Sequence, residues 1–128
     1  QDAATRRIAQ WALGRREIVR VLHPATPGSP GHEHWAAHCR AAAGLVTLEF
    51  DPAIAPERVD RFVDGLRLFG IGWSWAGPMS LAVPYRAGSA RVGSGYRGTM
   101  VRLSIGLEDV DDLIRDLEAG LAKLGDAE

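Results

Sequence analysis

Hydrophobic residues recur along the chain with two periods, one helical and one extended, and these periods predict most of its secondary structure. Near the N-terminus they follow the spacing i, i+4, i+7 and i+8, in a stripe formed by Ala4, Ile8, Trp11 and Ala12. Gly14 is a suitable end for this helix. The chain begins without methionine and already in helical rhythm, so we expect residues 1–14 to be the tail of a longer helix in a longer polypeptide.

The helical spacing predicts two further helices. Pro56 suits a first helical position, and the apolar face that follows it consists of Val59, Phe62, Val63 and Leu66. A longer stripe covers residues 108–124 and consists of Val110, Leu113, Ile114, Leu117, Leu121 and Leu124. Acidic residues near its start and Lys123 near its end suit the helix dipole. We interpret four acids of this helix as a solvated face: Asp111, Asp112, Asp116 and Glu118.

Two segments alternate with the period of a strand. In residues 45–50, the even-numbered positions are apolar and should face inward, whereas Thr47 and Glu49 should face outward. A strand over residues 101–107 would bury its odd-numbered positions, Leu107 included, and would turn Arg102 and Ser104 to the other face.

Proline and glycine mark the connections between these elements. Residues 23–32, HPATPGSPGH, are too rich in both to be regular structure, and a short helix over residues 32–39 can follow them. Residues 69–85 indicate irregular strand and turn, and residues 88–98 indicate a flexible loop. Helices and strands that do not alternate strictly favour an α+β domain, with a mainly antiparallel sheet covered by helices on one face.

Composition excludes several classes of function. A chain of 128 residues, 46% hydrophobic and 24% charged, is typical of one globular domain. A net charge of -1 with scattered basic residues gives no stripe for nucleic acid. No apolar run approaches the roughly 18 residues that a membrane span requires. Cys39 is alone and no signal peptide opens the chain, so we expect a cytoplasmic protein without disulfides.

Arg102 is the residue whose position best suits a binding role. On a rigid strand beside small neighbours, its planar guanidinium could bind a carboxylate through two parallel hydrogen bonds. The alternative is an ordinary exposed strand arginine, in a surface ion pair worth about 0–1 kcal/mol. Lys123 is the only lysine, and the helix dipole is its simplest explanation.

Three other groups of residues are weaker candidates. His34 and His38 could share a helix face, but no second ligand pair follows them, so no metal site is predicted. The glycines of residues 88–98 are not followed by G-K-[S/T] or by a helix, which argues against phosphate binding. Trp73 and Trp75 would share a strand face, as core or interface residues.

Three motifs follow one another along the chain: the loop HPATPGSPGHEHW, the run GLRLFGIGWSWAG, and the segment from Arg102 through GLEDVDDLIRDLEAGLAKL. Together and in this order they resemble the cystathionine β-lyases of the Cys/Met-metabolism family of pyridoxal-phosphate (PLP) enzymes. The resemblance implies that residues 1–128 are the small C-terminal domain of an aspartate-aminotransferase-like enzyme of fold type I. Residues 1–14 would then end the interdomain helix, and the large PLP-binding domain would lie upstream.

The resemblance also implies roles for individual residues. Arg102 corresponds to the arginine that binds the substrate's α-carboxylate, and Ser74 to a serine that lines the same site. Trp73 and Trp75 would shape the pocket, and Trp75 is typical of the β-lyase branch. No residue of this chain is implied to be catalytic or to bind the cofactor, because the Schiff-base lysine would lie in the absent domain. The chain alone should therefore be inactive.

The implied enzyme cleaves a carbon–sulfur bond by β-elimination in methionine and cysteine metabolism, with PLP as cofactor, an amino acid as substrate and a homotetramer as assembly. The chain departs from the β-lyase pattern at Met79, which replaces an acid, and at Ser104, which replaces a histidine. Residues 41–45, AAAGL, lack the usual serines. These changes leave the far end of the substrate open. The alternatives are a γ-acting lyase or synthase of the same family and a non-catalytic α+β binding module.

Overall fold

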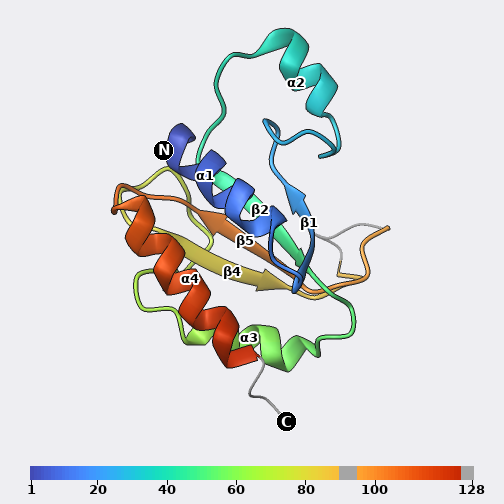
Figure 1. Ribbon diagram of the computed structural model, residues 1–128, viewed down its shortest axis with the longest axis vertical. Coiled ribbons are helices and arrows are strands. Elements are labelled where there is room, and N and C mark those ends of the chain that lie inside the picture. Colours follow the sequence, from blue (N-terminus) through green and yellow to red (C-terminus); the bar gives the residue numbers. More distant parts are fainter. Residues whose placement is uncertain (90–94, 125–128) are drawn as a thin grey trace.

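A five-stranded sheet with helices against one face forms the frame of the molecule (Figure 1). The computed structural model describes residues 1–89 and 95–124. In chain order the elements are α1 (Asp2–Leu13), β1 (Ile18–Leu22), α2 (His32–His38), β2 (Leu45–Phe50), α3 (Pro56–Asp64), β3 (Gly70–Ile71), β4 (Leu81–Tyr85), β5 (Met100–Ser104) and α4 (Val110–Leu124).

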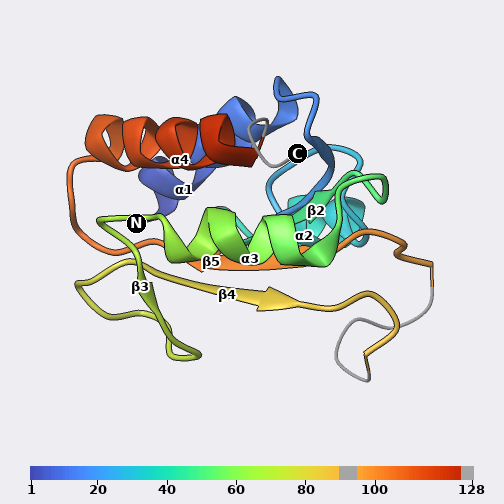
Figure 2. The same cartoon turned by 90° about the horizontal axis from the view of Figure 1, so that it is seen from below.

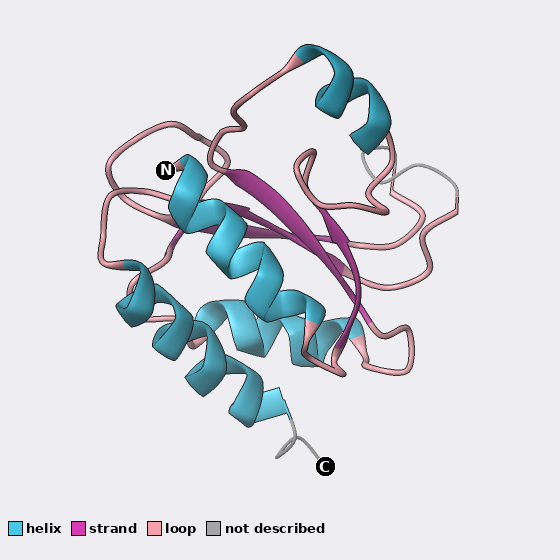
Figure 3. Ribbon diagram, turned by 45° about the horizontal axis from the view of Figure 1, so that its top comes forward, coloured by secondary structure: helices cyan, strands magenta, loops and turns pink. Residues whose placement is uncertain are grey.

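The sheet has the strand order β1-β2-β5-β4-β3. Neighbouring strands are antiparallel except for β3 and β4, which are parallel. The helices α1, α3 and α4 lie on the same side of the sheet. The short helix α2 lies away from them, in the long connection between β1 and β2 (Figures 2 and 3). The predicted α+β domain, with a mainly antiparallel sheet covered on one face, is confirmed.

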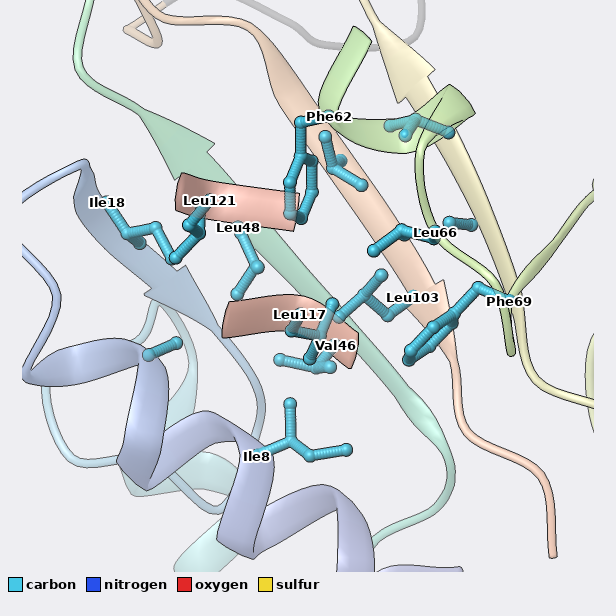
Figure 4. Close-up of a cluster of buried hydrophobic side chains, with 14 of the residues drawn as sticks. Ile8, Ile18, Val46, Leu48, Phe62, Leu66, Phe69, Leu103, Leu117 and Leu121 are labelled. Carbon is cyan, nitrogen blue, oxygen red and sulfur yellow. The ribbon is translucent and has the colours of Figure 1, made fainter. Parts of the chain in front are cut away.

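The core lies between the sheet and the three covering helices. Figure 4 shows Ile8 from α1, Val46 and Leu48 from β2, Leu103 from β5 and Leu117 from α4 pointing into one apolar cluster. All five are almost completely buried, as the predicted periods require. Burial of this kind stabilises the fold by about 1.5–3 kcal/mol for each large aliphatic side chain.

Two expectations for individual strand positions were wrong. Glu49 was expected to face solvent but is only 2% exposed. Its Oε2 accepts hydrogen bonds from the backbone N–H groups of Arg97 and Gly98, at 2.9 and 3.0 Å, and Arg20 pairs with its carboxylate at 3.3 Å. Leu107 was expected to be buried but is 71% exposed, because β5 ends at Ser104 and the alternation ends with it.

The last helix begins later than the apolar stripe suggested. It starts at Val110 rather than at residue 108, and the carboxylate of Asp109 accepts a hydrogen bond from the backbone N–H of Asp112, at 3.1 Å. Its acids are also more engaged than a plain solvated face: Asp116 accepts hydrogen bonds from the backbone N–H groups of Arg67 and Leu68, at 2.8–3.1 Å.

Part of the predicted flexible loop at residues 88–98 lies outside the described residues. Within the described ranges, no helix combines the length and the apolar character needed to cross a membrane.

Candidate functional site

Arg102 stands in the middle of β5, on the face of the sheet opposite the core. Its chain neighbours Val101 and Leu103 are completely buried on the core side, so alternation turns the Arg102 side chain to the other face. Its cross-strand neighbours are Thr47 of β2 and Val83 of β4. Because β5 is hydrogen-bonded to a strand on each side, the backbone of Arg102 is held in place, and only its side chain can change conformation.

The guanidinium of Arg102 is hydrogen-bonded to the backbone of the segment that follows β3. Nη2 of Arg102 donates to the carbonyl oxygen of Trp73 and, at 3.4 Å, to that of Ser74. The indole of Trp75 lies near the cation, with its ring centroid 5.9 Å from Cζ. It is thus the backbone carbonyl of Ser74, rather than its hydroxyl, that contacts Arg102.

The remaining N–H groups of Arg102 have no acceptor among the described residues. Nε is buried without a hydrogen-bond partner, and no described carboxylate forms an ion pair with the guanidinium. A buried donor without an acceptor costs about 1–3 kcal/mol. This half-buried cation therefore has both the charge and the donors to bind an anionic group, and no acid within residues 1–89 and 95–124 forms the surface ion pair considered as its alternative.

The two indoles lie outside any strand, so the expectation that they share a strand face was wrong. They belong to the irregular segment between β3 and β4, and Trp73 and Trp75 are 55% and 61% exposed. The ring of Trp73 meets Tyr85 edge-on, with centroids 5.4 Å apart. Ala76 follows with a φ of 65°, a left-handed conformation that is unusual for a residue with a side chain. The structure brings together Arg102, Ser74 and both indoles.

A polar contact that the sequence did not single out holds the end of this segment. Ser80 is completely buried, and Glu108 accepts hydrogen bonds from its backbone N–H at 2.9 Å and from its hydroxyl at 2.7 Å. Burial raises the pKa of Glu108, but the hydrogen bonds from Ser80 outweigh it and hold the pKa below its ordinary value. A buried serine directly before an apolar strand was the available signal, and only the fold shows its partner.

Several apolar side chains at the end of β3, in the segment after it and in the turn after β5 are exposed. They are Ile71, Trp73, Trp75, Met79 and Leu107. The backbone N–H of Leu107 donates to the carbonyl oxygen of Pro78 at 2.8 Å, so the turn and the segment are in contact. The first helix buries Ile8, Ala9 and Ala12 and exposes Leu13 at its end. Ser104, one of the unusual positions, is buried as well.

Lys123 lies far from this arrangement in the layered structure. It is exposed at the end of α4, in a groove that Gly65 and Asp116 also line, on the helix side of the sheet (Figure 2). Arg102 points from the opposite face. Lys123 therefore does not approach the guanidinium.

Of the histidines of α2, His32 is engaged locally. His32 stacks on Trp35 with ring centroids 5.8 Å apart, and its Nδ1 lies 2.7 Å from the carbonyl oxygen of Pro24. Within the described ranges, His, Cys, Asp and Glu side chains nowhere gather in threes close enough to hold a metal ion.

The chain is similar to known proteins along nearly all of its length. The profile of the family described as Cys/Met metabolism PLP-dependent enzyme matches residues 1–122. Cystathionine beta-lyase MetC of Escherichia coli (strain K12) is 37% identical over 123 residues, which are 92% of this chain and 31% of that protein. L-alanine/L-glutamate racemase of Wolbachia pipientis wMel is 39% identical over 120 residues, 91% of this chain and 30% of that protein.

Solved structures show the same relationship. The structure of cystathionine gamma synthase from Xanthomonas oryzae pv. oryzae in complex with cystathionine has a TM-score of 0.84 and 29% identity, and the match covers 99% of this chain and 34% of that chain. The present chain thus spans about a third of the length of the proteins it matches.

Proposed function

The chain belongs to the Cys/Met-metabolism family of PLP-dependent enzymes, and on that premise we propose that it binds the α-carboxylate of the substrate in a carbon–sulfur lyase. The observation that carries the proposal is the state of Arg102: a cation on a rigid strand, half-buried, with free donors and no described acid beside it. An amino acid's carboxylate has the planar shape and charge that a guanidinium binds through two parallel hydrogen bonds.

The proposed contribution of this chain is orientation. A carboxylate held by Arg102 fixes the direction of the bonds at the substrate's Cα, and correct orientation of this kind can supply several kcal/mol of the rate enhancement. Trp73 and Trp75 would form a wall that limits water at the same point. PLP, bound by residues outside this chain, would supply the electron sink for breaking the carbon–sulfur bond.

Cleavage on the β side of the substrate is the reaction we favour. Its support is the similarity to the E. coli cystathionine beta-lyase over most of this chain, together with the indole at Trp75. We propose that residues 1–128 are the small C-terminal domain of the enzyme, that residues 1–14 end its interdomain helix, and that a large PLP-binding domain precedes them. A homotetramer in the cytoplasm remains part of this prediction.

The reaction can be tested by the products that the full-length protein releases from L-cystathionine. Cleavage on the β side gives pyruvate, ammonia and homocysteine, whereas cleavage on the γ side gives 2-oxobutyrate, ammonia and cysteine. We expect pyruvate and homocysteine. Release of 2-oxobutyrate and cysteine would contradict the β assignment, and a full-length protein without cofactor absorbance would support the non-catalytic binding module.

Racemisation is a second candidate, favoured by the similarity to the Wolbachia racemase. A racemase also needs a bound α-carboxylate, so Arg102 serves both reactions equally. Loss of optical activity from L-alanine or L-glutamate, without release of pyruvate from L-cystathionine, would favour the racemase.

A further inference from the structure

A polar contact between Ser80 and Glu108 joins the strand of Arg102 to the segment that receives the guanidinium. The segment between β3 and β4 returns to the sheet at Ser80, and β5 continues from Arg102 into the turn that leads to Glu108. Both oxygens of the Glu108 carboxylate are bonded to Ser80, one to its N–H and one to its hydroxyl. The same hydroxyl accepts the backbone N–H of Gly106 at 2.8 Å.

The close approach of the two segments depends on a missing side chain. A Cβ at Gly106 would lie 2.3 Å from the carbonyl oxygen of Pro78 and 2.8 Å from Oε1 of Glu108. Distances of that size are not tolerated, so the turn and the segment can meet only where residue 106 is glycine. Ala76, four residues before Ser80, keeps a left-handed φ, which costs about 1 kcal/mol or more and persists only where neighbouring contacts enforce it.

The position of this segment determines where the guanidinium points. Arg102 donates through Nη2 to the carbonyl oxygens of Trp73 and Ser74, so a shift of those carbonyls rotates the guanidinium and moves its free donors. Ser80 is completely buried and Glu108 is half-buried, whereas most of residues 71–79 are exposed. The contact therefore anchors the end of the segment, beside the hydrogen bonds that the carbonyls of Gly77 and Pro78 accept from Gln1 and Leu107, at 3.1 and 2.8 Å.

We propose that Glu108 is a positioning residue: by binding Ser80 through both carboxylate oxygens, it fixes the carbonyls that orient Arg102 toward the substrate's carboxylate. This inference rests on the proposed function of Arg102. It predicts that the reach of the Glu108 side chain matters more than its charge. Glutamine keeps that reach without the charge, and aspartate keeps the charge but is too short by one methylene to bond Ser80.

The test compares Glu108→Gln and Glu108→Asp in the full-length enzyme with a matched control. Glu118→Gln makes the same substitution at an exposed carboxylate of α4, which accepts a hydrogen bond from the indole N–H of Trp11. KM and kcat are measured for an amino-acid substrate and for its α-carboxamide, which offers no carboxylate to Arg102. We expect KM for the carboxylate substrate to rise about 3- to 10-fold in Glu108→Gln and further in Glu108→Asp. KM for the carboxamide, cofactor absorbance and the control should stay as in the wild type.

Three outcomes would overturn the proposal. Equal losses for both substrates, with loss of cofactor, would assign Glu108 a purely structural role. A normal Glu108→Asp beside an impaired Glu108→Gln would assign its effect to charge rather than to contact. If Arg102→Lys raises KM while both Glu108 variants match the wild type, the positioning role alone is wrong, whereas an unaffected Arg102→Lys refutes the proposed function itself. Should Glu108→Asp fail to fold, Glu108→Gln decides between these outcomes.

Discussion

Replacement of Arg102 by lysine is the most direct test of the proposed carboxylate site. Lysine keeps the positive charge but offers a single ammonium in place of a planar guanidinium with several fixed donors. It cannot bond the carbonyl of Trp73 and also form two parallel hydrogen bonds to a carboxylate. The variant should therefore lose at least one of the two charge-assisted hydrogen bonds to the substrate.

The size of the effect follows from the strength of that bond. A hydrogen bond to a charged group contributes about 1.5–3 kcal/mol, and about 1.4 kcal/mol corresponds to a tenfold change in rate. We therefore expect kcat/KM of Arg102→Lys to fall about 10- to 150-fold. The fold should survive, because Arg102 is on the open face of the sheet and none of the core residues contributes to its hydrogen bonds.

The assay is product release from L-cystathionine by the full-length enzyme, with visible absorbance as a measure of bound cofactor. Arg115→Lys is the matched control, since that arginine is exposed on α4 and pairs with Asp112. The control should behave as the wild type, and Arg102→Lys should retain its cofactor. A kcat/KM within a factor of about two of the wild type would refute the reasoning, because even one lost charge-assisted bond predicts more.

Three further predictions concern the surroundings of the site and the stability of the fold. Gly106→Ala should lower the free energy of unfolding by about 1–3 kcal/mol and should also lower kcat/KM, because its Cβ would clash with the carbonyl oxygen of Pro78. A variant that unfolds and turns over like the wild type would contradict this. Asp60→Asn should destabilise the protein by about 0.2–1 kcal/mol at pH 7, because the hydrogen bond from Arg86 lowers the pKa of the partly exposed Asp60. That contribution is complete above the ordinary pKa of 3.8 and is lost as the pH falls through the lowered folded-state value, so urea unfolding of variant and wild type should converge in acid. The isolated chain should bind an apolar dye, less so after Trp73→Ser and Trp75→Ser, and a dye-silent wild-type chain would count against the exposed patch.

The helices and long strands could be predicted because their stabilisation comes from one-dimensional patterns. The stripes of α1, α3 and α4 and the alternation of β2 and β5 appear in the structure within a few residues of the expected bounds. The face of Arg102 followed from the same alternation, since Val101 and Leu103 are buried. Where a pattern ends is harder to predict, and Leu107 shows why: a strand stops when its ladder partners stop, and partners are set by the fold.

Contacts between distant segments could not be predicted in the same way. Glu49 looked like an exposed strand residue, but a loop some 50 positions later brings two backbone N–H groups to its carboxylate. Ser80 and Glu108 likewise meet only because β3, β4 and β5 are neighbours in the sheet. Trp73 and Trp75 were linked to Arg102 by the family resemblance alone, because nothing in their spacing indicates an irregular segment folded over a strand.

The two faces of β5 divide the work of the domain between stability and recognition. Its core-facing residues pack in the apolar cluster with residues of α1 and α4. The hydrophobic effect that stabilises this packing is strong but does not depend on the orientation of the groups. The outward face carries a directed polar group, and direction requires that the backbone beneath it be fixed at both ends. The β2 and β4 ladders fix the Cα of Arg102, and the carbonyls of Trp73 and Ser74 fix its tip. If the grip on the carboxylate is as we propose, a core substitution such as Leu103→Ala should lower the free energy of unfolding by about 2–5 kcal/mol. KM should stay close to the wild-type value wherever the variant is folded, because the ladders still fix the Cα of Arg102.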